Sequence, residues 1–195
     1  MLKKTDEGWS YMKYYDDDTF FPIVGEGITF TEVPLKIAVY FEIGNCRQNC
    51  PNCHSTHLKK ETNKYSSVGA IKDYAAQAVE SGANAIVIMG GTTNNNVTTL
   101  MLKHLINELA EIAPVCLYSG SDDAESDKEL ALETDLTWLK TGSYKEELGG
   151  LPNSATNQRF YKKEIRCVSC LTWLETEVYL QDITAIFRNY GVSNV

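Results

Sequence analysis

The sequence predicts an α/β fold with a mostly parallel β-sheet. Short apolar segments of strand length alternate with longer segments of helical period, and nearly every apolar segment ends in a small or polar loop. This alternation is typical of parallel strands, because a parallel pair needs a long crossover connection. The 195 residues are enough for one domain with a substantial core. We therefore expect a single domain over residues 20–195 and an N-terminal extension over residues 1–19, which lack a clear hydrophobic period.

Four short, mostly apolar segments are predicted to form the strands. The segment AIVIM is apolar throughout, as in a strand that is buried on both faces. Cys116 lies inside the third segment, VCLY, so we expect its thiol in the core. The predicted strands are residues 37–41, 85–89, 115–118 and 136–140.

Apolar residues at helical spacing predict the helices between and after these strands. The first helix is expected to begin after Ser66 or Ser67, whose hydroxyl can cap it, and to end at Gly82. The second predicted helix starts at Asn96 or Thr98 and ends near Pro114, and the other two span about residues 127–133 and 176–190.

The composition argues against several kinds of partner and location. The net charge is -8, whereas nucleic-acid binding relies on clustered Lys and Arg. No apolar segment approaches the roughly 20 residues that a membrane-spanning helix needs. The N-terminal residues MLKKTDEGWSYMKYYDDD lack the apolar stretch of a signal peptide. We therefore expect a cytoplasmic protein that binds proteins or small molecules, whose six cysteines are reduced or metal-bound rather than paired in disulfides.

Three of the six cysteines lie close together in the segment GNCRQNCPNCHS, residues 44–55. Cys46, Cys50 and Cys53 have the spacing C-x3-C-x2-C, and the segment follows the predicted strand 37–41. The cysteines should thus lie beyond the C-terminal end of a strand, where ligands bind in parallel sheets. Three structural thiols are one explanation, but their close spacing in a polar loop favours a metal centre.

Two metal centres are compatible with this spacing. Structural zinc prefers a closed tetrahedron, in which His54 or His57 would be the fourth ligand. A cubane iron–sulfur cluster normally takes four thiolates, so three cysteines would leave one iron without a protein ligand. An open coordination position is typical of a reactive site rather than a structural one.

Further segments narrow this choice. They are FPIVGEGITF (residues 21–30), IVIMGGTTNNN (86–96), CLYSG (116–120) and LKTGSYKEELGGLPNSATNQRFY (139–161). Together with the cysteine loop, they resemble the radical S-adenosylmethionine enzymes, and among these the activating proteins of anaerobic ribonucleotide reductase. The resemblance covers roughly residues 20–162. Asn52 stands where the wider family has an aromatic residue, and Thr92 stands where it has an acid.

The resemblance implies a fold and a cofactor set. The fold would be a partial (β/α) barrel with a mostly parallel sheet. Three ligands, Cys46, Cys50 and Cys53, would hold a [4Fe-4S] cluster whose fourth iron binds S-adenosylmethionine. The same resemblance places Asn52 and His54 beside the adenine of that molecule. Two further residues, Gly90 and Gly91, would let the backbone approach its methionyl group.

The resemblance also implies an activity and partners. The enzyme would cleave S-adenosylmethionine reductively to a 5′-deoxyadenosyl radical and generate a glycyl radical on the large subunit of an anaerobic ribonucleotide reductase. A flavodoxin-like protein would donate the electron. The alternatives are an activase of another glycyl-radical enzyme, another small radical S-adenosylmethionine enzyme, or a zinc-binding interaction module without turnover.

Other polar residues and a second cysteine pair are weaker site candidates. Cys167 and Cys170 form a close pair that could be a redox dithiol, part of a zinc site shared with a partner, or two reduced thiols. Turn formation, capping or surface ion pairing would equally explain the remaining candidates. These are Ser119, Gly120, Lys140, Asn157 and Arg159.

Overall fold

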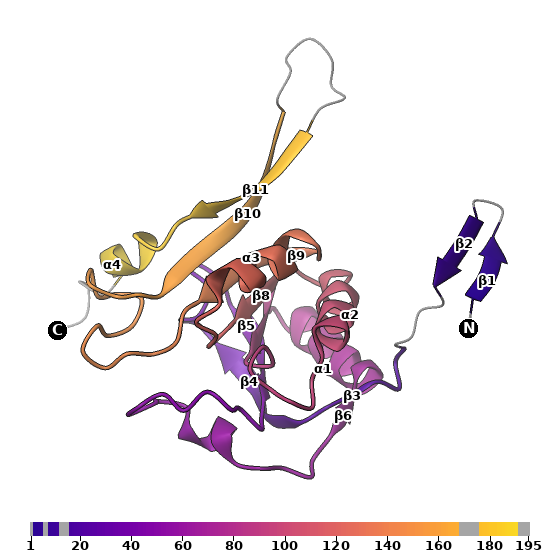
Figure 1. Cartoon of the computed structure of the whole chain (residues 1–195), viewed down its shortest axis with the longest axis horizontal. Helices are drawn as coiled ribbons and strands as arrows, with labels where there is room; N and C mark the ends of the chain where they lie inside the picture. The colour runs from indigo at the N-terminus through magenta and orange to yellow at the C-terminus, as the bar shows by residue number, and fades with distance from the viewer. Residues whose placement is uncertain (1, 6–7, 12–15, 168–175, 191–195) are drawn as a thin grey trace.

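The computed structural model describes residues 2–5, 8–11, 16–167 and 176–190. Its main element is a mixed sheet of seven strands (Figure 1). These strands are β4 (Ile23–Thr29), β5 (Ala38–Ile43), β7 (Ala85–Met89), β8 (Val115–Tyr118), β9 (Leu136–Thr141), β10 (Arg159–Cys167) and β11 (Thr176–Asp182). Their order across the sheet is β11-β10-β9-β8-β7-β5-β4.

The centre of the sheet is parallel and its two sides are antiparallel. Strands β5, β7, β8 and β9 pair in parallel, which confirms the predicted α/β class and the four predicted strands. Antiparallel pairing adds β4 to β5 on one side, and β10 and β11 to β9 on the other. The described residues do not form the expected partial barrel. A barrel would need further βα units beside the parallel strands, and antiparallel strands stand there instead. The sheet is open, with β4 and β11 at its edges.

Three helices connect the parallel strands, and each has a side-chain cap. They are α1 (Val68–Glu80), α2 (Thr99–Ala110) and α3 (Ala124–Leu132). Ser67 accepts a hydrogen bond from the backbone of α1, Thr98 from that of α2, and Asp123 from that of α3. Ser67 and Thr98 are each one of the two candidate starts that the sequence offers for their helices, since a side-chain oxygen just before an apolar-periodic segment satisfies a free backbone N–H group.

The predicted helix over residues 176–190 is wrong for its first half. Residues 176–182 form strand β11, and only Ile186–Tyr190 are helical, as α4. The register with β10 runs without interruption from Tyr161↔Asp182 to Cys167↔Thr176. Pairing with a neighbouring strand outweighed the helical spacing of the apolar residues, which is a weak signal in a short segment.

Smaller elements complete the described chain. Strands β1 (Leu2–Thr5) and β2 (Gly8–Tyr11) form a two-stranded antiparallel sheet within the N-terminal extension. Strand β3 (Phe20–Phe21) pairs with β6 (Ser66–Ser67), and the short 3-10 helix η1 (Thr56–Lys59) follows the cysteine loop.

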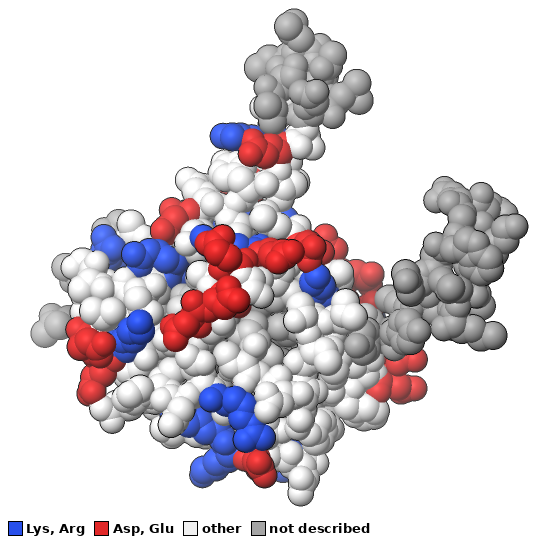
Figure 2. Space-filling model, in the orientation of Figure 1, with Lys and Arg blue, Asp and Glu red and all other residues white. Residues whose placement is uncertain are grey.

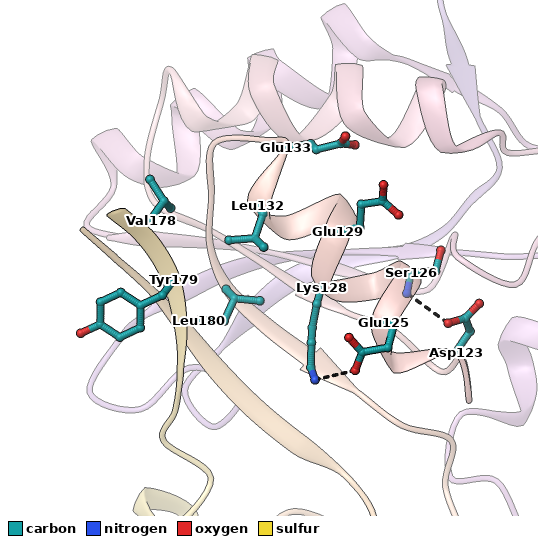
Figure 3. Close-up of a pocket in the computed structure, with 10 residues that line it drawn as sticks. All are labelled: Asp123, Glu125, Ser126, Lys128, Glu129, Leu132, Glu133, Val178, Tyr179 and Leu180. Atoms are coloured by element: carbon teal, nitrogen blue, oxygen red, sulfur yellow. Dashed lines mark hydrogen bonds and ion pairs between the residues drawn. The ribbon is translucent and has the colours of Figure 1, made fainter. Parts of the chain in front are cut away.

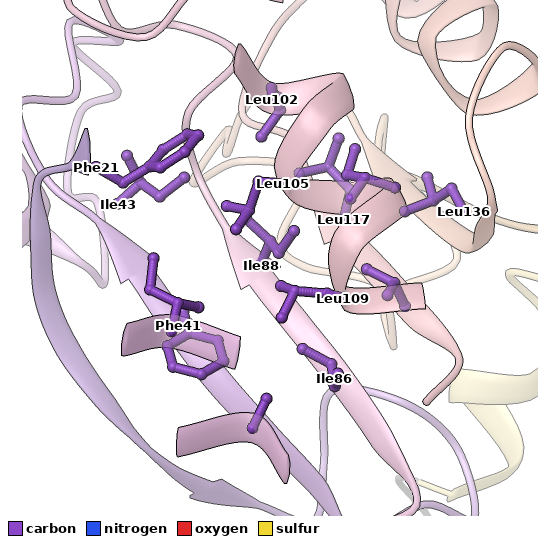
Figure 4. Packing of buried hydrophobic residues seen from close by; sticks show 14 of the residues in the cluster. Phe21, Phe41, Ile43, Ile86, Ile88, Leu102, Leu105, Leu109, Leu117 and Leu136 are labelled. Atoms are coloured by element: carbon purple, nitrogen blue, oxygen red, sulfur yellow. The ribbon is translucent and has the colours of Figure 1, made fainter. Parts of the chain in front are cut away.

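Apolar side chains bury both faces of the parallel strands. On one face, residues of the three crossover helices pack against alternate strand residues such as Phe41, Ile86 and Ile88 (Figure 4). On the other face, Cys116 lies in a second cluster with Phe160, and its fully buried side chain confirms the predicted core position. Burial on both faces explains why the central strands are continuous apolar runs. Among the described helices, none combines the length and the apolar character that crossing a membrane requires.

Candidate functional site

Four loops meet at one edge of the sheet. Residues 44–55 follow β5, residues 90–98 follow β7, residues 119–123 follow β8, and residues 142–158 follow β9. Because these strands are parallel, their C-terminal ends lie at the same edge, where open α/β sheets bind ligands. Of the described residues, the site candidates named from the sequence lie in or directly beside these loops, apart from Cys167.

The cysteine loop is held by backbone hydrogen bonds. The Cys46 N–H group donates to the Leu58 carbonyl over 2.8 Å, and the Arg47 N–H group donates to the Thr93 carbonyl over 3.2 Å. The Cys46 thiol also lies 3.5 Å from the Thr93 hydroxyl. The bond to Leu58 attaches the first cysteine to η1, and the contacts with Thr93 attach this part of the loop to the loop after β7.

Asp122 ties three of the four loops together. Its Oδ2 accepts a hydrogen bond from the Gln48 amide at 3.3 Å, and its Oδ1 accepts one from the Ser143 hydroxyl at 2.5 Å. Both bonds favour the ionised carboxylate, and the bond from Ser143 is the main reason why the pKa of Asp122 is lowered. Sequence reasoning missed this residue, because nothing local distinguishes it from the neighbouring surface acids.

The three thiols supply donors that suit a soft metal centre. Cys46, Cys50 and Cys53 are all free and half-buried. Three sulfur ligands on one loop suit iron–sulfur or zinc chemistry, which thiolates favour. In the part of the chain that the structure describes, no three His, Cys, Asp or Glu side chains form a metal-binding group. The donor type suits the implied cluster, whereas the sulfur positions do not form a metal site, so the loop would have to draw the three sulfur atoms together around the cluster.

Asn52 and His54 connect the cysteine loop to the loop after β9. The Asn52 amide donates to the Glu146 carboxylate over 2.5 Å, and the His54 ring centroid lies 4.7 Å from that of Tyr144. Asn52 has φ 49°, a left-handed conformation in which asparagine is well tolerated. Both residues lie at the edge where the resemblance puts them, and their assignment to adenine stays a prediction.

Gly90 and Gly91 have a structural reason to be glycine. Their φ angles are 89° and 93°. A Cβ atom on Gly90 would lie 3.0 Å from the Ile43 carbonyl oxygen, and one on Gly91 would lie 2.9 Å from the Ile43 side chain. The pair lets the chain turn tightly against the end of β5. The expected approach of a ligand to this backbone stays a prediction.

Replacing Gly90 with alanine should destabilise the fold by about 1–3 kcal/mol, the range for a strained non-glycine residue at positive φ. The close approach to a rigid carbonyl adds to this cost. Gly120→Ala is the matched control, because its Cβ would meet nothing within 4 Å. Chemical denaturation of both variants measures the difference. Equal stability of the two would contradict the assignment of strain to Gly90.

A buried polar cluster lies beneath these loops. The Thr92 and Ser119 hydroxyl oxygens are 2.8 Å apart, and the Thr141 hydroxyl donates to the Asp127 carboxylate. Asp127 is 4% exposed, and this burial raises its pKa. Sequence reasoning missed Asp127, although it lies three residues before the buried Leu130 and hence on the core side of α3.

Lys140, near the end of β9, belongs to this buried cluster. Its ammonium group donates to the Ser119 carbonyl at 3.2 Å and to the Gly142 carbonyl at 2.7 Å. Burial lowers the pKa of Lys140 to about 8, and negative charge on Cys50 is the largest effect that opposes this shift.

The two candidates in TNQR have structural contacts. The Asn157 amide donates to the Ser143 carbonyl over 3.0 Å. The Arg159 guanidinium donates to the Thr156 carbonyl over 2.6 Å and lies 3.7 Å from the Asp182 carboxylate. The Asn157 contact joins the two ends of the loop after β9, and the Arg159 contacts join the start of β10 to that loop and to the end of β11.

The second cysteine pair is described only in part. Cys167 is exposed at the end of β10, at the opposite end of that strand from Arg159. Cys170 lies outside the described residues. The nature of this pair is therefore left as a sequence-based hypothesis.

Comparisons with known proteins provide no independent identification. A scan of protein-family models, a search of curated proteins and a search of solved structures each found no match to this chain.

Proposed function

We propose that the chain is a radical S-adenosylmethionine enzyme that generates the glycyl radical of an anaerobic ribonucleotide reductase. The observation that carries this proposal is the three-cysteine motif C-x3-C-x2-C at the C-terminal edge of a parallel sheet. It is supported by the other segments that resemble this branch of the family, three of which contribute loops to the same edge.

The residues at this edge would divide the work as follows. Thiolates of Cys46, Cys50 and Cys53 would hold a [4Fe-4S] cluster and leave its fourth iron open. When bound, this cluster supplies one-electron reductive cleavage of S-adenosylmethionine, which is the source of the hydrogen-abstracting radical. Gly90 and Gly91 would let the backbone approach the methionyl group of that substrate, and Asn52 and His54 would lie beside its adenine.

The charge of the chain is compatible with protein partners. A net charge of -8 disfavours a phosphate-backbone partner, whereas the proposed activity needs the large subunit of the reductase and an electron donor such as a flavodoxin.

The proposal is tested by anaerobic turnover. Reconstituted protein is incubated with dithionite, S-adenosylmethionine and the candidate reductase, and 5′-deoxyadenosine and a glycyl-radical EPR doublet are measured. Both signals are expected. Cleavage without the doublet would keep the radical chemistry and reject this partner. Purified protein that contains zinc but neither iron nor dithionite-bleachable absorption would reject the enzyme assignment.

His54→Ala should leave the iron content unchanged, because the proposed cluster needs only the three thiolates. His57 lies 2.9 Å from the Glu42 carboxylate, a contact that is compatible with metal ligation through its other ring nitrogen, so His57→Ala is measured in parallel. Iron per chain and the visible spectrum are measured after reconstitution, with Cys53→Ala as the variant that must lose iron. Metal loss in the His54 variant would instead support a closed site of three cysteines and one histidine.

A further inference from the structure

A groove lies between α3 and the edge strand β11 (Figure 3). Its volume is about 870 Å³. Acidic side chains of α3 lie along one side of the groove, and apolar side chains from both elements form its floor. No role in the proposed radical chemistry involves these residues.

The floor of the groove exposes apolar surface. Leu132 is 43% exposed and Val178 is 41% exposed. Val178 pairs directly with Ile165 of β10, which is 68% exposed, so both lie on the same face of the sheet. Adjacent exposed apolar side chains rimmed by polar ones are typical of an interaction surface.

The rim of the groove is negatively charged. Lys128 forms an ion pair with Glu125 at 2.8 Å, and Lys103 forms one with Glu133, so the net negative charge of the rim comes from Asp123 and Glu129. Glu129 is exposed and has no salt bridge within the described part of the chain. Figure 2 shows acidic side chains grouped over the region of α3. The acidic residues that line the groove are Asp123, Glu125, Glu129 and Glu133.

Strand β11 adds backbone groups to this surface. It lies at the edge of the sheet, and in the described residues its register is only with β10. The second edge of such a strand presents backbone N–H and C=O groups to which an extended peptide can bind.

We propose that this groove docks a segment of a partner protein in which apolar side chains alternate with Lys or Arg. The apolar floor would take the apolar side chains, and the acidic rim would take the cationic ones. A second copy of this chain is a poor occupant, because each copy carries a net charge of -8. Residues 168–175 and 191–195 of this chain contain no Lys or Arg, so they lack the complementary charge.

The test uses the full chain and a short fluorescein-labelled peptide in which Leu and Lys alternate. Binding is followed by fluorescence anisotropy, and its site is mapped by hydrogen exchange. Glu129→Lys and Leu132→Ser should each weaken binding by about ten-fold or more. Protection from exchange should increase in α3 and β11. A peptide with Glu in place of Lys should not bind.

Matched controls separate docking from general attraction to an acidic protein. Glu80→Lys makes the same charge change at the exposed end of α1, and Leu100→Ser makes the same apolar change at a residue that is 61% exposed on α2. Both controls should change the affinity by less than about two-fold. Equal losses in control and groove variants, protection confined to other elements, or peptide-independent dimerisation that the Leu132 variant abolishes would each overturn the proposal.

Discussion

Replacing Cys46, Cys50 or Cys53 with alanine is expected to abolish cleavage of S-adenosylmethionine. Loss of a group that only orients a metal ligand typically costs about 10–100-fold in metal affinity or activity, so loss of a ligand itself should cost at least about 100-fold. Each variant should also lose iron and the visible absorption of the cluster. The measurements are iron per chain, the absorption spectrum after reconstitution, and 5′-deoxyadenosine formed under dithionite.

Cys167→Ser provides the control for thiol loss. This cysteine is exposed at the end of β10 and lies outside the four loops, so its replacement should preserve iron content and cleavage. Full iron content in any of the three loop variants would contradict the assigned ligand set. Equal loss in the Cys167 variant would show that the assay responds to thiols in general.

Replacing Phe41 with alanine should cost about 3–5 kcal/mol of unfolding free energy, the usual range for truncating a buried aromatic residue. Phe41 has no exposed surface, and its ring packs edge-to-face against Tyr74 at a centroid distance of 5.8 Å. Small domains have only about 5–15 kcal/mol of total stability. Because Phe41 lies on β5, two residues before the end of the strand that leads into the cysteine loop, the same variant should also reconstitute less cluster.

The control for Phe41 is Phe30→Ala, which makes the same chemical change at a side chain that is 69% exposed. Chemical denaturation should show little change for this variant, since most of its surface is already in water. Comparable destabilisation of the two variants would contradict the core position of Phe41.

The central strands and their crossover helices could be predicted because their signals are local. Burial on both faces demands continuous apolar runs, as in AIVIM, and Ser67 and Thr98 cap their helices through contacts within three residues. The placement of the three cysteines, Gly90 and Gly91 at one edge followed from the same reasoning. Parallel strands must bring their C-terminal ends together.

The antiparallel strands at the sides of the sheet could not be predicted in the same way. Strand β10 forms by pairing with β9 and β11. Residues 176–182 were expected to be helical, and they form β11 because they pair with β10. A short segment with apolar residues at several spacings fits both the helical and the strand period, and only pairing with another strand decides which structure it forms. For the same reason, the partial barrel expected from the resemblance was replaced by an open, mixed sheet.

The sequence by itself determined the α/β class, the four parallel strands and the clustering of three thiols just beyond one of them. These features depend on residue type and on spacing along the chain. Only the tertiary structure decided that Asp122 links three loops, that Asp127 and Lys140 are buried beneath them, and that α3 and β11 enclose an acidic groove. Burial and hydrogen bonding between distant segments depend on how the chain packs, which no local pattern specifies.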